Sequence, residues 1–306
     1  MPDPNFDVIV IGAGIAGLTA AKNTAQQGLA TASIEALLFG GLVINVNELD
    51  PAPSGEHLSG TDLASNLMME IAELGAANLS ETATALARDG DFLSVVTDAG
   101  KRRARAVIVA SGAKLKRLGI PGEAEFEHRG VSQCADCDGP MYKDEDVVVV
   151  GGGDSALQEA LALADYCRRV HLVHRGAGFR ARRHLIDAVA ARDNIRPLWN
   201  TVAEEVLGKR MVNKVRVRDV SGGKITDIPC TGFFAYIGLA PNCDFAPPEI
   251  KRDARGYVMT DDSLHTAMAG VFAAGAVRAG CGGMLTDAMA DAQTAAAAAG
   301  AHLGAR

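Results

Sequence analysis

Two cysteines, Cys134 and Cys137, are separated by two residues, a spacing that can close a disulfide and open it again. They lie just ahead of the second of two glycine-rich segments, residues 12–17 and 151–156. A glycine-rich turn between a strand and a helix can hold the pyrophosphate of one dinucleotide. Two dinucleotide sites and one dithiol therefore predict an electron relay.

The first glycine-rich segment follows an apolar run at residues 6–11 and precedes a helical stretch that ends near Gly28. Its candidate cofactor contacts are Gly12, Gly14, Ala16 and Gly17. Glu35 closes the next apolar segment, residues 31–34, at the distance where a carboxylate can accept hydrogen bonds from a ribose diol. A glycine-rich turn in an ordinary α/β protein is the alternative interpretation, and Glu35 favours the nucleotide site.

The second glycine-rich segment repeats this arrangement, with a strand predicted at 146–150 and a helix at 157–167. Its candidate cofactor contacts are Gly151, Gly153, Asp154, Ser155 and Ala156. A further strand is predicted at 169–173. The repeat predicts a second dinucleotide-binding unit.

Basic residues follow that last strand. Counted from the first glycine of each segment, His174 stands where Glu35 stands in the first copy, and Arg175 comes next. A base at this position suits a 2′-phosphate, so the second site should prefer NADPH over NADH. Arg180 is a further candidate for the phosphate contact.

Other basic residues have two interpretations. Arg182 and Arg183 could extend the phosphate clamp or form a solvated face. The run at 101–105 is expected to be an exposed turn beside a strand at 106–110. A formal net charge of -7 argues against a nucleic-acid partner.

Length and composition indicate a two-domain protein. The chain has 306 residues and no apolar run long enough to cross a bilayer, so no membrane partner is expected. Its start enters a predicted strand directly and lacks the basic and then apolar pattern of a signal peptide. We therefore expect a cytoplasmic protein.

Six cysteines are present, and only the pair at 134 and 137 has redox or metal-ligand spacing. A structural zinc site would need a second close pair, which the sequence lacks. Three others are expected to be small packing residues: Cys167, Cys230 and Cys243. Cys281 lies in a glycine-rich loop that would leave its thiol accessible, and no task is assigned to it.

Taken together and in order, these motifs resemble the low-molecular-weight thioredoxin reductases, pyridine nucleotide-disulfide oxidoreductases with FAD and a CxxC dithiol. The resemblance runs nearly from end to end. Besides the motifs above it includes residues 40–42, 107–113, 129–132, 174–175, 179–181, 233–242 and 270–275.

The resemblance implies an α/β fold with two Rossmann-like dinucleotide-binding domains, each built of three layers (ββα). The FAD domain would comprise residues 1–117 and 245–306. The NADPH domain, residues 118–244, would be inserted into it and would carry the dithiol. A homodimer is expected, because FAD-domain helices usually pair two chains in this family.

The resemblance also implies site roles. Cys137 would be the sulfur next to the flavin, Cys134 the one that exchanges with substrate, and Asp138 the general acid. A carboxyl beside the pair can supply or accept the proton that each exchange step requires. Asp138 could instead be a turn residue before Gly139. Further FAD contacts would be Gly41, Leu42, Asn47, Ser111, Gly112, Gly275, Ala276 and Ala288.

Two departures from the family pattern concern the flavin. Ala276 stands where the family has an aspartate that hydrogen-bonds the ribityl chain, so one flavin anchor is missing. Residues 286–288 replace an Arg-Gln-Ala triplet at a helix N-terminus. The helix dipole could still stabilise an anionic reduced flavin, and Asp287 would work against it.

Two more departures concern the substrates. Pro140 and Met141 replace two phenylalanines that help to dock thioredoxin in the family, while Arg129 remains where the family has a docking arginine. Gly176 replaces a second arginine that is common in NADPH-dependent members.

Asp136 places a carboxylate between the two cysteines. A negative charge there should disfavour the thiolates and so favour the disulfide. The dithiol is therefore expected to be the stronger reductant.

The favoured function is an NADPH-dependent disulfide reductase that acts on a thioredoxin-like protein or a small-molecule disulfide. The alternative is a flavin-dependent dithiol oxidase that closes a disulfide in a small molecule and passes electrons to oxygen. An intact second glycine-rich segment with Arg175 and Arg180 argues against that alternative. A binding or sensing protein would follow only if Ala276 had abolished flavin binding.

Overall fold

The computed structural model describes residues 6–46, 49 and 57–304. The chain divides into two compact units. Unit 1 contains Met1–Lys114 and Ala240–Arg306, and unit 2 contains Leu115–Leu239. Where the chain passes between the units, the short strands β7 (Ala113–Leu115) and β16 (Leu239–Pro241) pair with each other.

Unit 1 is built on one sheet in the order β3-β2-β1-β6-β5-β4, with β17 paired to the end of β6. Its parallel part comprises β1 (Phe6–Ile11), β2 (Thr31–Ile34), β3 (Ala77–Leu79), β6 (Gly100–Val109) and β17 (Val271–Ala273). An antiparallel hairpin, β4 (Ala83–Asp89) and β5 (Phe92–Thr97), continues the sheet from the first half of β6.

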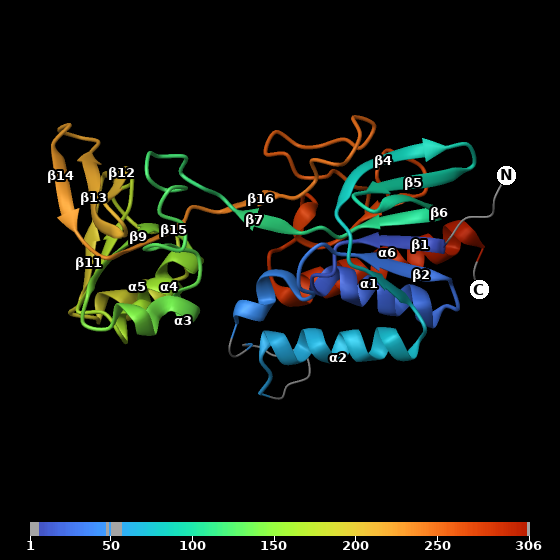
Figure 1. Ribbon diagram of the computed structural model, residues 1–306, viewed down its shortest axis with the longest axis horizontal. Helices are drawn as coiled ribbons and strands as arrows, with labels where there is room; N and C mark the ends of the chain where they lie inside the picture. Colours follow the sequence, from blue (N-terminus) through green and yellow to red (C-terminus); the bar gives the residue numbers. More distant parts are fainter. Residues whose placement is uncertain (1–5, 47–48, 50–56, 305–306) are drawn as a thin grey trace. The chain divides into compact units, whose positions relative to one another are not determined.

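Side chains of β1 point alternately to two apolar cores. Val8 and Val10 join the helices on one face, whereas Ile9 and Ile11 join the hairpin and the C-terminal loops on the other. The helices are α1 (Ile15–Gln26), α2 (Gly60–Glu73) and α6 (Leu285–Leu303). Within unit 1, α1 packs against both α2 and α6 (Figure 1). Buried positions of α6 are mostly alanine, and small side chains let two helices approach closely.

Unit 2 contains an entirely parallel sheet in the order β11-β10-β9-β15-β8. Its strands are β8 (Val131–Ser132), β9 (Asp146–Gly151), β10 (Arg169–Val173), β11 (Ile195–Leu198) and β15 (Gly232–Tyr236). The helices of the unit are α3 (Ala135–Asp138), α4 (Asp154–Ala164) and α5 (Arg183–Ala190). A second, antiparallel sheet comprises β12 (Thr201–Gly208), β13 (Val212–Asp219) and β14 (Ile225–Pro229).

Strand β9 lies in the middle of the three layers of unit 2, between the helices and the antiparallel sheet. Val147 and Val149 pack against α4 and α5, while Val148 and Val150 pack against β12–β14. A run of four valines suits a strand that is buried on both faces. Figure 1 shows the helices of unit 2 on one side of the parallel sheet and β12–β14 on the other. The predicted α/β class with parallel-stranded sheets is confirmed.

Two local predictions were wrong. The helix expected at 157–167 is α4, Asp154–Ala164, because the turn ends at Gly153 and Asp154 already lies in the first helical turn, where an acid is favoured. The basic run at 101–105 is not a turn but the first half of β6. It stays extended because it pairs with β5, and Asp89 and Glu81 balance its charges.

Short 3-10 helices connect the larger elements in the described residues: η1 (Gly41–Asn45), η2 (Gly139–Tyr142) and η3 (Gly275–Val277). Across the described part of the chain, every helix is too short or too polar to span a bilayer.

Candidate active site

The two closely spaced cysteines form a disulfide, Cys134–Cys137, at the start of α3. Cys134 is the N-cap of this helix, and its Sγ accepts a hydrogen bond from the Cys137 N–H at 3.1 Å. Cys137 is exposed and Cys134 is half-buried. The disulfide is therefore held at a helix terminus where an attacking thiolate can reach it.

A half-buried carboxyl, that of Glu159, holds the turn between the cysteines. Ala135 is fully buried, and its N–H donates to Oε2 of Glu159, on α4, at 3.0 Å. The same oxygen accepts the hydroxyl of Tyr236, on β15, at 3.0 Å. Burial raises the pKa of Glu159 above its usual range and also raises that of Tyr236. Neither Glu159 nor Tyr236 was among the predicted site residues.

Asp138 directly follows the disulfide and is half-buried. It precedes η2, yet its side chain makes no capping hydrogen bond to that turn. Burial, reinforced by the Asp138 charge, raises the pKa of Tyr142 to about 12. The next residue is Gly139. A larger residue there would be crowded, because its Cβ would lie 3.0 Å from the Tyr166 ring. Asp136 is exposed on α3.

In unit 1 the first glycine-rich segment packs tightly on one side and is open on the other. Gly12 has φ +102°, and a Cβ there would lie 2.5 Å from the Ala110 carbonyl oxygen. A Cβ at Gly17 would overlap the Gly12 carbonyl oxygen. At Gly14, by contrast, the nearest described atom would be 3.9 Å away. The open position leaves room for a ligand to approach the backbone.

Glu35 lies beside this segment. Its Oε2 accepts the Ala13 N–H at 3.0 Å, which fixes the carboxylate next to the turn. A cavity of about 450 Å³ begins here. It is lined by Ile11, Gly12, Ile34, Glu35, Ala36, Glu81, Thr82, Ala83, Thr84, Ser111, Asn242, Asp244 and Phe245. An open glycine turn, a neighbouring carboxylate and a cavity beyond it fit the adenosine end of a dinucleotide.

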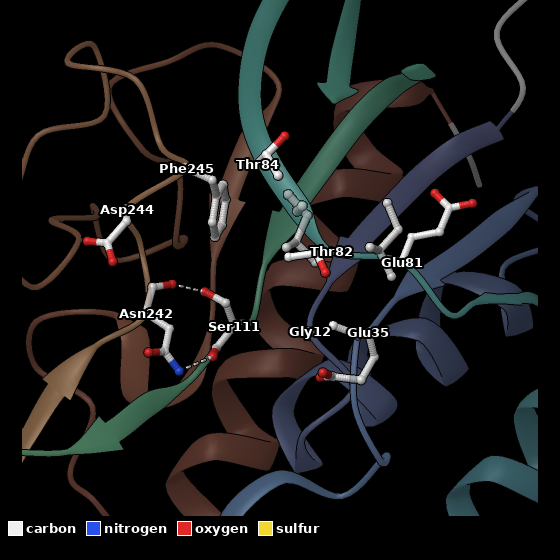
Figure 2. Close-up of a pocket in the computed structure, with 13 residues that line it drawn as sticks. Gly12, Glu35, Glu81, Thr82, Thr84, Ser111, Asn242, Asp244 and Phe245 are labelled. Atoms are coloured by element: carbon white, nitrogen blue, oxygen red, sulfur yellow. Dashed lines mark hydrogen bonds between the residues drawn. The ribbon is translucent and has the colours of Figure 1, made fainter. Parts of the chain in front are cut away.

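Ser111 and Asn242 close one side of the cavity (Figure 2). The Ser111 hydroxyl donates to the Asn242 carbonyl oxygen, and Asn242 Nδ2 donates to the Ser111 carbonyl oxygen at 3.2 Å. The Asn242 N–H also donates to the Gly112 carbonyl oxygen at 2.9 Å. Asn242 was not among the predicted site residues, although it belongs to a segment that carried the family resemblance.

The structure brings together predicted cofactor residues that are far apart in sequence. A Cβ at Gly41 would lie 3.2 Å from the Gly14 Cα. A Cβ at Gly275, which has φ +74°, would lie 2.7 Å from Ala16 and 3.7 Å from Ala288. Leu42 is exposed, Ala276 is half-buried, and Asn47 lies outside the described residues. Three segments of unit 1 thus meet around the first glycine turn.

One half-buried ion pair at this junction was not predicted. Asp291, on α6, accepts the Gly275 N–H at 3.0 Å and the Arg278 Nε at 2.6 Å. The ion pair therefore fixes η3, which holds Ala276. Asp291 lies on the buried stripe of α6, three residues after Ala288 and four before Ala295. An acid on the apolar face of a predicted helix was the available signal.

The second glycine-rich segment, in unit 2, is supported by His174. A Cβ at Gly151 would overlap Ala156, and one at Gly152 would overlap the His174 ring. His174 is only 7% exposed, and its Nδ1 lies 2.9 Å from the Gly151 carbonyl oxygen. A Cβ at Gly153 would meet no described atom within 4 Å, so the start of α4 is open to a ligand.

The neighbouring arginines fall into two groups. Arg175 and Arg180 are exposed, and among the described residues neither guanidinium has a carboxylate partner. Arg182 pairs with Asp154 at 2.7 Å, and Arg183 pairs with Asp187 at 2.9 Å. Ser155 is exposed in the first turn of α4. Arg175 and Arg180 are the two that remain available to an anionic ligand.

The remaining cysteines lie apart from the disulfide in the chain, and three are buried: Cys167, Cys230 and Cys243. Burial raises the pKa of Cys167 to about 12 and that of Cys230 to about 12. Cys281 is half-buried, and burial raises its pKa as well.

Asp287, the acid at the start of α6, accepts the Met284 N–H at 3.0 Å and so caps that helix.

Comparison with known proteins places the chain in a family. Residues 6–299 match the model of the pyridine nucleotide-disulphide oxidoreductases. The chain is 37% identical over 278 residues to a thioredoxin reductase of Treponema pallidum, covering 90% of each chain. It is 38% identical over 276 residues to a thioredoxin reductase of Bacillus subtilis, covering 89% of this chain and 87% of that one.

Solved structures agree with the sequence matches. The structure is similar to that of Lactococcus lactis thioredoxin reductase, with a TM-score of 0.93 and 32% identity over 98% of this chain and 99% of that one. The predicted family resemblance is thus confirmed. The chain belongs to the pyridine nucleotide-disulphide oxidoreductase family, as an FAD- and NADPH-dependent disulfide oxidoreductase of the low-molecular-weight thioredoxin reductase type.

Proposed function

We propose that the Cys134–Cys137 dithiol reduces the disulfide of a thioredoxin-like protein or of a small molecule. The observation that carries this proposal is the disulfide itself, at the accessible start of α3 in the unit that holds the second glycine-rich segment. Bound FAD would supply the hydride chemistry that links NADPH to the two-electron reduction of this disulfide. The chain's own residues then carry out the thiol chemistry.

Cys134 is the sulfur that exchanges with the substrate. Its thiolate attacks one substrate sulfur, a mixed disulfide forms, and the other substrate sulfur leaves and takes up a proton. The Cys137 thiolate then attacks Cys134, which releases the second substrate sulfur and restores the Cys134–Cys137 disulfide. Asp138, with no capping hydrogen bond, is the group that supplies protons to the leaving thiolates.

The cofactor contacts are part of the proposal. Residues of the first glycine-rich segment hold the FAD pyrophosphate, and Glu35 holds the adenosine ribose. The other FAD contacts are Gly41, Leu42, Asn47, Ser111, Gly112, Gly275, Ala276 and Ala288. In unit 2 the NADPH pyrophosphate binds at Gly151, Gly153, Asp154, Ser155 and Ala156. Arg175 and Arg180 contact its 2′-phosphate, supported by His174, which lies against the glycine turn.

Two copies of the chain associate as a homodimer in this proposal. Support comes from apolar side chains of unit 1 that the single chain leaves exposed: Leu37, Leu38, Met69 and Leu74. Four free cysteines suit a reducing compartment, which agrees with a cytoplasmic enzyme.

An anaerobic visible spectrum tests the proposal. The purified protein is titrated in turn with NADPH, NADH and a small dithiol. Bleaching of bound flavin by NADPH at low stoichiometry supports the reductase, and turnover with thioredoxin or a small disulfide then identifies the substrate class. A flavin that ignores both nucleotides overturns it.

A second candidate, an oxygen-dependent dithiol oxidase of a small molecule, is favoured by one observation. Met141, two residues after Gly139, is 70% exposed, and with Pro140 it replaces the aromatic anchors expected for docking thioredoxin. In that case the flavin bleaches with the small dithiol, ignores NADPH, and recovers its colour in air.

A further inference from the structure

Glu159 links the helix that follows the second glycine-rich segment to the turn that carries the disulfide. It lies on α4, the helix that starts at the second glycine-rich segment, one and a half turns from Asp154. From there its carboxyl reaches the backbone N–H of Ala135, between the two cysteines. A single side chain thus connects the nucleotide-binding helix with the dithiol turn.

Three polar groups act on this carboxyl. Tyr236 donates its hydroxyl from β15, the Ala135 N–H donates from α3, and Asp136 adds a like charge from the same short helix. Burial and Asp136 disfavour the ionised carboxylate, and the two hydrogen bonds favour it. A carboxylate that accepts two donors is tightly held, so its position relative to the cysteines is fixed.

We propose that Glu159 is a positioning residue of the dithiol, which holds the Cys134–Cys137 turn closed and makes the reduced pair a stronger reductant. The hydrogen bond to Ala135 fixes the turn in the shape that forms the disulfide. The ionised carboxylate repels a thiolate next to it, which disfavours the reduced form. Both effects favour the disulfide and therefore favour release of electrons.

This inference rests on the proposed role of the dithiol, but its test requires neither NADPH nor substrate. Dithiothreitol reduces the disulfide in two exchange steps. Its thiolate attacks one protein sulfur, the Cys134–Cys137 bond breaks, two electrons and two protons pass to the protein sulfurs, and dithiothreitol leaves as a cyclic disulfide. The equilibrium can be measured on the full-length protein whether or not NADPH reduces its flavin.

Two variants separate charge from position. Glu159→Gln keeps an oxygen that can accept the Ala135 N–H but removes the charge, whereas Glu159→Ala removes both. Asp165→Asn is the matched control, because it neutralises a carboxylate at the other end of α4 that pairs only with the exposed Arg192 among the described residues. The dithiol-to-disulfide ratio is measured by alkylation and mass spectrometry after equilibration at pH 6 to 9.

For Glu159→Gln we expect the alkylation profile of the reduced cysteines to move about one pH unit lower. The equilibrium should then shift toward the dithiol up to about tenfold at pH 9 and scarcely at pH 6, because one pKa unit corresponds to a factor of ten. Glu159→Ala should add a further shift toward the dithiol that is the same at every pH. In that variant no carboxyl accepts the Ala135 N–H, so the Cys134–Cys137 turn is no longer held.

Tyr236→Phe provides an independent variant. It keeps the Glu159 carboxyl but removes one of the two donors that hold it, so it should give part of the pH-independent shift expected for Glu159→Ala. If Glu159→Gln and Tyr236→Phe both match the wild type and Asp165→Asn at every pH, the proposal is overturned. Because neither variant leaves the Ala135 N–H without an acceptor, loss of folding is not expected to obscure the result.

Discussion

Asp291 and Arg278 form a half-buried ion pair in which Nε of Arg278 lies 2.6 Å from Oδ2 of Asp291. The same carboxylate accepts the Gly275 N–H, so one side chain of α6 holds the turn that carries Ala276. The family has an acid at position 276, and here an acid on the neighbouring helix fixes the backbone of that turn instead.

Removing Asp291 should therefore weaken FAD binding. For Asp291→Ala we expect a loss of about 3 kcal/mol in the free energy of unfolding, because Arg278 is left unpaired, and a tenfold or greater rise in the Kd for FAD. Urea unfolding and FAD titration of the apoprotein measure the two effects. Asp187→Ala breaks the exposed pair with Arg183 and should cost about 0.5 kcal/mol without a change in FAD affinity. Unchanged FAD affinity in Asp291→Ala would contradict the prediction.

Two glycines of the first segment should respond differently to alanine. Gly17→Ala forces a methyl group onto the Gly12 carbonyl oxygen, so α1 can no longer pack on β1 and the unit should be strongly destabilised. Gly14→Ala meets no such contact and should fold with nearly the wild-type melting temperature, yet its methyl group faces the open side and should displace FAD. Thermal melts and the flavin-to-protein ratio distinguish them, and a stable Gly14→Ala protein with full flavin would refute the placement of the ligand.

Arg175 and Arg180 should determine the choice of nucleotide. Substituting either by alanine removes a charge-assisted contact to the 2′-phosphate, so kcat/KM for NADPH should fall by about ten- to a hundredfold. The value for NADH, which lacks that phosphate, should change by less than about twofold. Arg183→Ala is the control, because its guanidinium is paired with Asp187. An equal fall in kcat/KM for NADPH and NADH would mean that these arginines do not contact the 2′-phosphate.

Local sequence patterns predicted the parts of this fold that depend on neighbouring residues. The strands predicted at 146–150 and 169–173 are β9 and β10, because a short β-branched run between turn residues is a local signal. The basic run at 101–105 was misassigned because its strand depends on pairing with β5 and on Asp89 and Glu81. β5 is adjacent in the chain, but the pairing and the carboxylates lie outside the run itself and cannot be read from its own composition.

In the site, too, only residues with a local sequence signal could be predicted. Both glycine turns could be predicted, since each motif is contiguous. Glu159 and Asp291 were not, because their partners, Ala135 and Gly275, are 24 and 16 residues away and donate through the backbone. Asp291 lies on the buried stripe of α6, and Glu159 is half-buried on α4 beside the buried Ala160. A carboxyl at such a position must find a donor, which makes it a useful signal.

The free cysteines should react in an order set by burial. With a pKa of about 12, Cys167 and Cys230 have roughly one thiolate in ten thousand at pH 8. Iodoacetamide should therefore label Cys281 first in the oxidised protein, and slowly, because burial also raises its pKa. Mild reduction should add Cys134 and Cys137. Peptide mass spectrometry follows each site, and modification of Cys167 at the rate of Cys281 would contradict the burial argument.

Asp136 should tune the dithiol less strongly than Glu159 does. Its carboxylate is exposed, so water and salt screen its repulsion of a thiolate, whereas Glu159 is half-buried and held by two donors. For Asp136→Thr we expect the reduced form to gain only about threefold at pH 8. The sign follows from charge: removing a negative group stabilises the thiolate, which favours the dithiol and makes it a weaker reductant. Equilibration with dithiothreitol at low and high salt measures this, and the difference from wild type should shrink as salt rises. No difference at low salt would show that the carboxylate between the cysteines has no effect on their potential.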